Sequence, residues 1–255
     1  MTIVYTQHMS LERPSRRTAL TLLAVAALSF ALNLVFGAFR VVRTDSDDGW
    51  TAQGTVPLPR PRSESDVSVE AAVADRRSRR EYADRALERR ELGQLLWATQ
   101  GVTDRRRGYR AAPSAGALYP LELYVVVGSP GVEGLESGVY RYRPERHELD
   151  QGRTGDVRAE LREAAIDQGF VEEAPVDVVL FGVDERTTRK YGERGSERYV
   201  PMEAGHAGQN LYLQAEALGL ATVSVGAFGD DRVREVVEAP ADQRPLYVFP
   251  VGGSP

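Results

Sequence analysis

The chain has 255 residues, a formal net charge of −5 and no cysteine. This length is enough for one large domain with its own hydrophobic core, and the lack of cysteine excludes disulfides, thiolate metal sites and a thiol nucleophile. The acidic balance argues against a nucleic-acid binder that depends on bulk positive charge. The three histidines lie far apart in the sequence and show no metal-ligand spacing, so no metal site is predicted.

The first 66 residues divide into three segments. Residues 1–17 form a basic N-terminal segment, and residues 18–39 hold 22 uncharged residues, enough to cross a bilayer as a helix. The stretch "SRRTAL", Ser15–Leu20, is similar to a twin-arginine export signal. An export signal and a permanent membrane anchor therefore both stay open, as does the side of the membrane that holds the rest of the chain. Residues 40–66, rich in Asp, Ser, Pro and Gly, predict a flexible linker.

From residue 67 to residue 255 the pattern predicts one folded domain. Ser68 is placed to cap a first helix. Gly101 and Gly219 are placed to end two longer helices, and Gly169 and Asp230 are expected to close and to cap two shorter ones. The sequence predicts helices over 69–77, about 87–100, 156–168, about 202–218 and a short stretch after 230, with a polar loop around Lys190. It predicts strands over 121–127, 138–143, 176–183, 221–226 and 246–251. Strands and helices alternate irregularly, which favours an α+β fold.

Three stretches carry residues that suit a flat, anionic ligand. In "RRSRREY", 76–82, arginines around a serine can hold a phosphate through bidentate hydrogen bonds. In "PSAG", 113–116, and "SVGAF", 224–228, small residues let backbone amides approach a ligand closely. A further arginine cluster, 105–110, is a candidate for anion binding. Taken singly, each stretch also fits a simpler interpretation, solvated arginines or an ordinary turn.

Lys190 is the only lysine among the 32 basic residues, and it stands beside Tyr191. Arginine stays protonated in proteins, whereas lysine can give up its proton where its surroundings favour the neutral amine. A chain that uses arginine elsewhere has therefore kept lysine here either by chance or because proton transfer requires it. Both interpretations remain open from the residues alone.

Together, the order of "RRS-R-EY", "PSAGALYP", "KYGERG" and "EAGHAGQNLYLQAEALGLATVSVGAF" resembles the nitroreductase family. Within the family it is most similar to the SagB-type dehydrogenases, which oxidise thiazolines and oxazolines. The likeness covers roughly residues 55–252. It implies a three-layer α+β fold, with a central antiparallel or mixed sheet flanked by helices. It also implies a homodimer that binds FMN in its interface.

The resemblance also assigns roles to residues of this sequence. It implies that the FMN phosphate and the pyrimidine end of the ring meet Arg76, Arg77, Ser78 and Arg80. It implies that a loop covering the ring, usually from the partner subunit, is formed by Pro113, Ser114, Ala115 and Gly116. The segment facing flavin N5 would hold Ser224, Gly226 and Ala227, and the catalytic pair would be Lys190 and Tyr191. The C-terminus "VGGSP" lacks the basic residue that many nitroreductases place on the phosphate.

The activity implied is FMN-dependent transfer of two electrons as hydride through flavin N5, on a small-molecule or peptide substrate. Two alternatives stay open beside the dehydrogenase. One is a nitro or quinone reductase that uses NAD(P)H as its electron donor. The other is a membrane-tethered flavin-binding protein without turnover.

Overall fold

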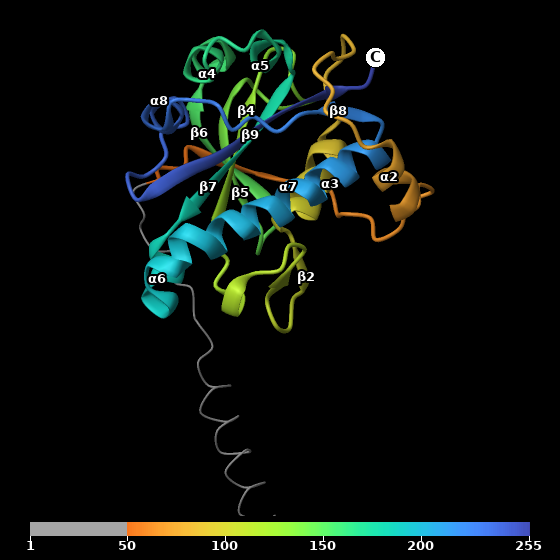
Figure 1. Ribbon diagram of the computed structural model, residues 1–255. Coiled ribbons are helices and arrows are strands. Elements are labelled where there is room, and N and C mark those ends of the chain that lie inside the picture. Colours follow the sequence, from red (N-terminus) through yellow and green to blue (C-terminus); the bar gives the residue numbers. More distant parts are fainter. Residues whose placement is uncertain (1–49) are drawn as a thin grey trace, which may run out of the picture. The chain divides into compact units, whose positions relative to one another are not determined.

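A seven-stranded sheet with the order β1-β6-β5-β4-β7-β9-β8 forms the centre of the molecule, and each neighbouring pair is antiparallel. The structure is a computed structural model that describes residues 50–255. Helices cover both faces of the sheet (Figure 1). The predicted α+β class with a helix-flanked central sheet is therefore confirmed, and of the two alternatives for the sheet the antiparallel one holds.

The strands and helices have the following bounds. The sheet contains β1 Gly54–Pro57, β4 Leu121–Val127, β5 Gly138–Arg143, β6 Glu148–Thr154, β7 Val176–Val183, β8 Leu220–Thr222 and β9 Gln243–Gly253. A separate hairpin is made of β2 Val102–Asp104 and β3 Tyr109–Arg110. The helices are α2 Val69–Asp75, α3 Arg89–Gln100, α4 Arg158–Ala164, α5 Gly169–Glu173, α6 Glu185–Tyr191, α7 Val200–Ala217 and α8 Asp230–Val236. Two short irregular helices are η1 Ala115–Ala117 and η2 Gly195–Tyr199.

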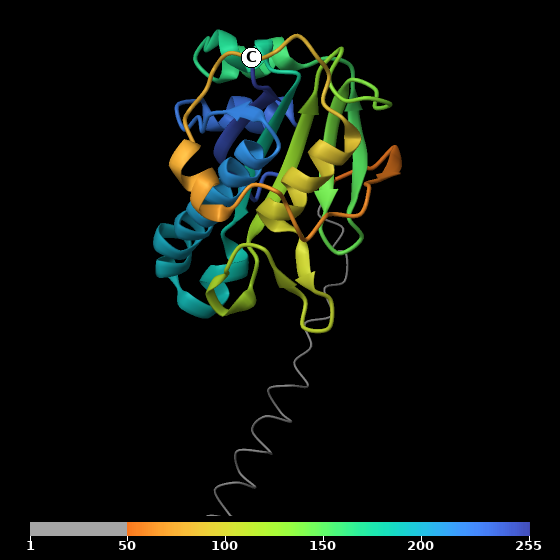
Figure 2. The same cartoon turned by 90° about the vertical axis from the view of Figure 1, so that its right-hand side faces the viewer.

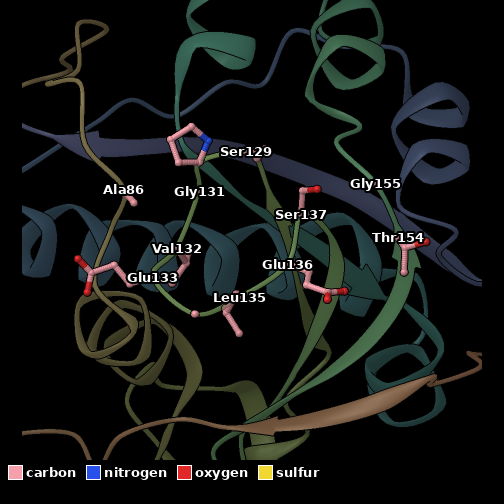
Figure 3. A pocket seen from close by; sticks show the side chains of 13 residues that line it. Ala86, Ser129, Gly131, Val132, Glu133, Leu135, Glu136, Ser137, Thr154 and Gly155 are labelled. Atoms are coloured by element: carbon pink, nitrogen blue, oxygen red, sulfur yellow. The ribbon is translucent and has the colours of Figure 1, made fainter.

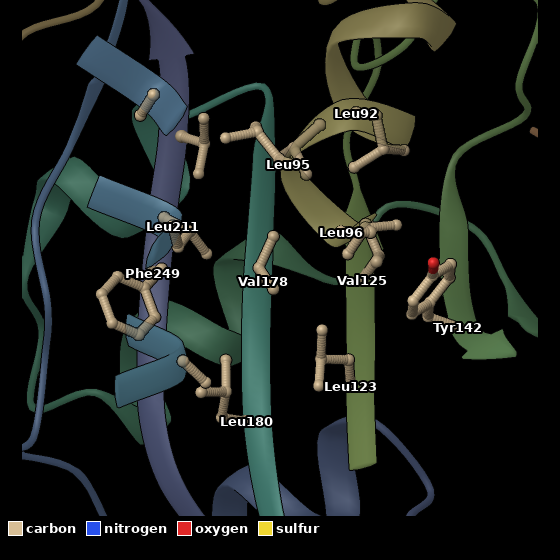
Figure 4. Packing of buried hydrophobic residues seen from close by; sticks show 14 of the residues in the cluster. Leu92, Leu95, Leu96, Leu123, Val125, Tyr142, Val178, Leu180, Leu211 and Phe249 are labelled. Carbon is tan, nitrogen blue, oxygen red and sulfur yellow. The ribbon is translucent and has the colours of Figure 1, made fainter. Parts of the chain in front are cut away.

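Alternating residues of the central strands fill two separate cores, one on each face of the sheet. On β4, Leu123 and Val125 pack with leucines of α3 and α7 (Figure 4), whereas Tyr124 and Val126 pack with residues of α4, α5 and α8. β7 is buried along its whole length, as expected for a strand in the middle of a covered sheet. The result is three layers: α3 and α7, the sheet, and α4, α5 and α8.

Several predicted local features are confirmed. β4, β5 and β7 have the predicted bounds. The Ser68 hydroxyl accepts a hydrogen bond from the backbone N–H of Ala71 at 3.1 Å, so Ser68 caps α2. Gly219 follows the last turn of α7 with a φ of +67°, a conformation that glycine adopts without strain.

Other local predictions are wrong. The polar loop expected around Lys190 is the helix α6, whose charged residues sit on a solvated surface and therefore give no apolar period. The helix expected over 156–168 is shorter and contains only α4, and Gly169 begins the next helix, α5, instead of closing its predecessor. β8 ends at Thr222, short of the predicted 226, and Gly229 replaces Asp230 as the N-cap of α8.

The expected linker, 40–66, joins the fold earlier than predicted. β1 lies inside this range and pairs with β6, from Gly54 opposite Gln151 to Pro57 opposite Glu148. Trp50 packs edge-on against Tyr124 with ring centroids 5.1 Å apart. Composition missed this strand because an edge strand of four residues has too few positions to show a pattern. The predicted segments 1–17 and 18–39 lie outside the described residues. Within 50–255, no helix is long and apolar enough to cross a membrane.

Candidate functional site

Tyr212 joins two of the predicted cofactor-binding segments. It lies in α7 with its side chain buried, and its hydroxyl accepts a hydrogen bond from the backbone N–H of Ser224 at 2.7 Å. The same oxygen lies 3.3 Å from the hydroxyl of Ser224 and 3.1 Å from the hydroxyl of Ser78. The guanidinium of Arg76 stacks over the Tyr212 ring, 5.1 Å from its centroid. We call Arg76, Ser78, Tyr212 and Ser224 the tyrosine cluster.

The arginines of residues 76–80 differ in what they contact. Arg79 forms an ion pair with Glu216 at 2.5 Å, and Arg77 donates to the backbone carbonyls of Ala74 and Arg76 at the end of α2. Arg80 stacks over the ring of Phe170 at 5.4 Å, and neither Arg76 nor Arg80 has a carboxylate partner among the described residues. Arg76 and Arg80 are therefore the guanidinium groups that can still receive an anion.

The predicted segment 224–227 presents an open backbone surface next to the tyrosine cluster. Ser224, Gly226 and Ala227 are exposed, and a Cβ added to Gly226 would meet no atom within 4 Å. The neighbouring backbone is held in place, because Val225 pairs with Val248 of β9 and Gln168 donates to the carbonyl of Ala227 at 3.0 Å. The N–H groups of Gly226 and Ala227 have no hydrogen-bond partner among the described residues and can donate to a ligand.

The second group of predicted residues is also brought together. Gly116 has a φ of +65°, and a Cβ added there would lie 2.7 Å from the Tyr191 hydroxyl and 2.8 Å from the Lys190 ammonium nitrogen. That nitrogen lies 5.2 Å from the centroid of the Tyr191 ring, which packs edge-on against Tyr199. Pro113, Ser114 and Ala115 lead into the same turn. We call Gly116, Lys190 and Tyr191 the lysine cluster.

The backbone around Gly116 is strained. Besides Gly116, Ala117 and Tyr119 have positive φ angles of +54° and +46°, which cost a non-glycine residue about 1 kcal/mol or more each. Two hydrogen bonds hold the turn: the hydroxyl of Ser114 accepts from the N–H of Tyr119 at 2.9 Å, and Arg186 of α6 donates to the carbonyl of Tyr119 at 3.0 Å. Strain that is held by specific bonds occurs frequently at functional sites.

Glu122 anchors this arrangement from β4. Its carboxylate pairs with Arg186 and with Arg141, the second pair at 3.1 Å. Burial raises the pKa of Glu122, but the two guanidinium groups outweigh burial and hold the pKa at about 2. The carboxylate is therefore ionised at neutral pH and fixes Arg186 against the strained turn.

The two clusters lie at opposite ends of α7 within one chain (Figure 1). Tyr199, which contacts Tyr191, immediately precedes α7, and Tyr212 comes thirteen residues later. At 1.5 Å per helical residue this corresponds to about 20 Å. The structure thus brings the predicted residues into two groups and does not bring those groups together.

The residues that support both clusters were not predicted from the sequence. Tyr212 and Tyr119 contact predicted residues directly. Arg186 and Glu122 act on the predicted turn only through Tyr119. Tyr212 reaches Ser78 across 134 positions of sequence, a separation at which no local pattern indicates contact. Tyr212 and Tyr119 lie within the quoted stretches 205–228 and 113–120, whereas no quoted stretch contained Arg186 or Glu122.

Two other features stand apart from both clusters. A pocket of about 570 Å³ is lined by Ala86, residues 128–137, Thr154 and Gly155 (Figure 3), and it contains none of the predicted site residues. Asp177 on β7 is fully buried, and burial raises its pKa well above the usual range. Among the described residues, no group of three or more His, Cys, Asp or Glu side chains is placed to hold a metal ion.

The three-layer fold and its two residue clusters define a class of α+β proteins, and comparison with known proteins places the chain within it. The model of the family described as "Nitroreductase family" matches residues 73–253. This chain belongs to the nitroreductase family.

Individual relatives support the same assignment. A protein of Methanocaldococcus jannaschii that is named a nitroreductase is 48% identical over 187 residues, which cover 73% of this chain and 91% of the relative. The crystal structure of a protein named a nitroreductase from Ralstonia eutropha has a TM-score of 0.69 at 27% identity, covering 81% of this chain and 94% of that one.

A more distant likeness concerns proteins that process peptides. The microcin B17-processing protein McbC of Escherichia coli is 30% identical over 145 residues, which span 54% of this chain and about half, 52%, of McbC. A chain of the E. coli microcin synthetase McbBCD complex, solved with truncated pro-MccB17 bound, has a TM-score of 0.62 at 25% identity and covers 78% of each chain.

Proposed function

We propose that this chain is an FMN-dependent oxidoreductase that transfers two electrons as hydride through flavin N5. The observation that carries the proposal is the tyrosine cluster, in which Tyr212 joins the arginine segment 76–80 to the open backbone of 224–227. When bound, FMN supplies the hydride chemistry, and the protein supplies position and charge.

The residues of this structure fit such a cofactor. Arg76 and Arg80 offer two guanidinium groups for a phosphate, and Ser78 adds a hydroxyl next to them. The exposed N–H groups of Gly226 and Ala227 can donate to a ring edge, whereas those of Ser224 and Val225 already donate within the protein. The space beside Gly226 leaves room for the ring.

Separation of the two clusters supports a homodimer with a composite site. About 20 Å of α7 lies between Tyr199 and Tyr212, so one flavin ring cannot touch both clusters of the same chain. A second copy related by a two-fold axis would bring its lysine cluster and its turn 113–116 to the first copy's tyrosine cluster. Light scattering of the full chain tests this proposal, and a monomer that retains FMN would contradict it.

Lys190 and Tyr191 are the proposed proton-transferring residues. Oxidation of an azoline removes a hydride, which the flavin takes, and a proton, which a basic side chain must accept. Lysine can do so and arginine cannot. The likeness to McbC and this Lys-Tyr pair favour a SagB-type dehydrogenase, whereas the 48% identical relative favours a nitro or quinone reductase with NAD(P)H as donor.

An absorbance spectrum of the purified full chain, followed by release of its chromophore, tests the cofactor. We expect flavin absorbance and one FMN per chain. Colourless protein that also fails to take up added FMN would refute the proposal. The Arg76→Gln and Arg80→Gln variants should then bind FMN more weakly, while Arg79→Gln, whose guanidinium is committed to Glu216, serves as the control.

Membrane attachment through residues 18–39 stays a prediction, and we include it in the proposal. Carbonate extraction of membranes from cells that express the full chain tests it. A chain that begins at residue 50 is the control, and equal release of both chains by carbonate would contradict attachment.

A further inference from the structure

The end of the molecule that holds Lys190 is positively charged, although the whole chain is acidic. The segments 104–110 and 185–198 contain nine basic and four acidic side chains, a formal charge of +5, in a chain whose net charge is −5. The remaining segments are therefore strongly acidic. Such an uneven distribution creates a local positive electrostatic field that attracts anionic ligands.

These two segments lie at the same end of the molecule in both views (Figures 1 and 2), next to the turn at 115–117. Tyr119 connects them directly. The Arg110 guanidinium stacks over the Tyr119 ring at 4.9 Å, and Arg186 donates to the Tyr119 carbonyl at 3.0 Å. The β2–β3 hairpin and α6 are thus the two flanks of the lysine cluster.

Carboxylates of the protein neutralise only some of these basic groups. Ion pairs are formed by Arg107, Arg110, Arg186 and Arg189. The others have no ion-pair partner among the described residues: Arg105, Arg106, Lys190, Arg194 and Arg198. All five are exposed, and the nearby acids that remain without an ion pair are Glu193 and Glu197. An excess of accessible positive charge therefore surrounds Lys190.

We propose that the lysine cluster takes an anionic organic substrate, which the arginines of the β2–β3 hairpin and α6–η2 attract to the site. This inference rests on the proposed function and adds its substrate class. The arginines at the tip of the hairpin act through their field without touching the reacting group, so the effect belongs to association and depends on salt. A neutral substrate of the same shape gains nothing from this field, and a cationic one is repelled.

Three nitroaromatic acceptors of similar size test the proposal: 4-nitrobenzoate, 4-nitrobenzyl alcohol and 4-nitrobenzyltrimethylammonium. The FMN-loaded full chain is photoreduced and mixed with each compound, and flavin reoxidation gives a second-order rate constant. The reduced flavin gives up a hydride, the solvent supplies one further proton, and the nitro group becomes nitroso with release of one water. At low salt we expect the anion to react about tenfold faster than the neutral compound. The difference should vanish near 1 M salt, where the Debye length is about 3 Å.

A double variant, Arg105→Gln with Arg106→Gln, should lower the anion-to-neutral ratio about threefold. The matched control, Arg90→Gln with Arg232→Gln, removes two exposed arginines of α3 and α8 and should leave that ratio unchanged. Equal rates for all three acceptors, a preference that salt does not alter, or equal effects of the two variants would overturn the inference while leaving the FMN proposal intact.

Equilibrium dialysis of the same three compounds against the oxidised, FMN-loaded chain decides the case in which none reoxidises the flavin. Tighter binding of 4-nitrobenzoate at low salt would then support the inference. Binding of the anion that is no tighter than that of the cation would overturn it. Failure of the chain to bind FMN would refute the proposed function and this inference together.

Discussion

The two ends of helix α7 are built in opposite ways. At its C-terminal end, a buried tyrosine hydroxyl links two segments, and the exposed backbone at Gly226 and Ala227 is held by the neighbouring bridge of Val225 with Val248. At its N-terminal end, Lys190 is exposed, and the neighbouring turn holds three residues with positive φ between 116 and 119. The first arrangement suits a bound group that stays in place, and the second suits a substrate that comes and goes.

This difference suggests that one end of α7 binds the cofactor and the other end receives the substrate. The tyrosine cluster orders its surroundings through hydrogen bonds before any ligand binds. The lysine cluster is ordered through charge, from Glu122 to Arg186 to the Tyr119 carbonyl. Substitutions at the tyrosine cluster and at the lysine cluster should therefore differ in the size or the kind of their effects.

The largest effect is expected from Lys190→Arg. This variant keeps the positive charge but cannot release a proton, so we expect turnover to fall by about 10²-fold or more. FMN content should stay unchanged, because the variant keeps the positive charge and the groups proposed to hold the FMN phosphate are Arg76 and Arg80. The rates of flavin reduction and reoxidation in single-turnover experiments measure the change in turnover. Unchanged turnover would return Lys190 to the class of incidental surface residues.

Next in size is Tyr212→Phe, which keeps the ring over Phe249 and under Arg76 but removes the hydroxyl. Loss of its bonds to Ser78 and Ser224 should destabilise the chain by about 2 kcal/mol and weaken FMN binding. Chemical denaturation and flavin titration measure the two effects. The control is Tyr247→Phe, because Tyr247 also packs on Phe249 and its hydroxyl has no hydrogen bond to a described residue. Equal losses in both variants would contradict the role of the Tyr212 hydroxyl.

A smaller effect is expected from Gly116→Ala. Its φ of +65° costs alanine about 1.5 kcal/mol, and the new methyl group would press on Lys190 and Tyr191. Gly219→Ala is the matched control at the other end of α7, since Gly219 has a φ of +67° and open space around it. Both variants should lose stability in thermal unfolding, and only Gly116→Ala should also lose turnover. Equal turnover in the two variants would show that the contact has no function.

The smallest effect is a pH dependence confined to the lysine end. The folded-state pKa of Glu122 is about 2, below its ordinary value of 4.5. Its contribution to stability is therefore complete above pH 4.5 and is lost as the pH falls towards 2. At pH 3.5 the loss is on the order of 1 kcal/mol. Amide exchange should rise around 114–119 before it rises around 222–225, and Glu122→Gln should remove this difference. Simultaneous loss of protection at both ends would contradict it.

The sequence predicted elements well where a short stretch determines its own conformation. Buried strands such as β4 and β7 and the Ser68 cap follow from local residue patterns. The prediction failed at α6, where solvated charges conceal the helical period, and at β1, which exists only because β6 lies beside it. The strand β1 forms through its pairing with β6, and no property of the residues 54–57 alone indicates a strand.

The candidate site followed the same rule. Motifs predicted Arg76, Ser78, Ser224, Gly116 and Lys190, and the structure groups them into two clusters. The residues that hold those clusters were not predictable, because their contacts join distant parts of the chain. Glu122 and Arg186 are 64 positions apart, and Tyr212 and Ser78 are 134 apart.

The position of β1 has a mechanical consequence. A pull on the chain from its N-terminal side would load the contact of Trp50 with Tyr124 and then the four antiparallel pairs from Gly54 with Gln151 to Pro57 with Glu148, at the outer edge of the sheet. The hydrogen bonds of these pairs would break one after another from Gly54 onward, while the inner strands β4, β7 and β9 stayed paired. Tension applied before residue 50 would therefore separate the edge strand from the sheet before it reached either end of α7.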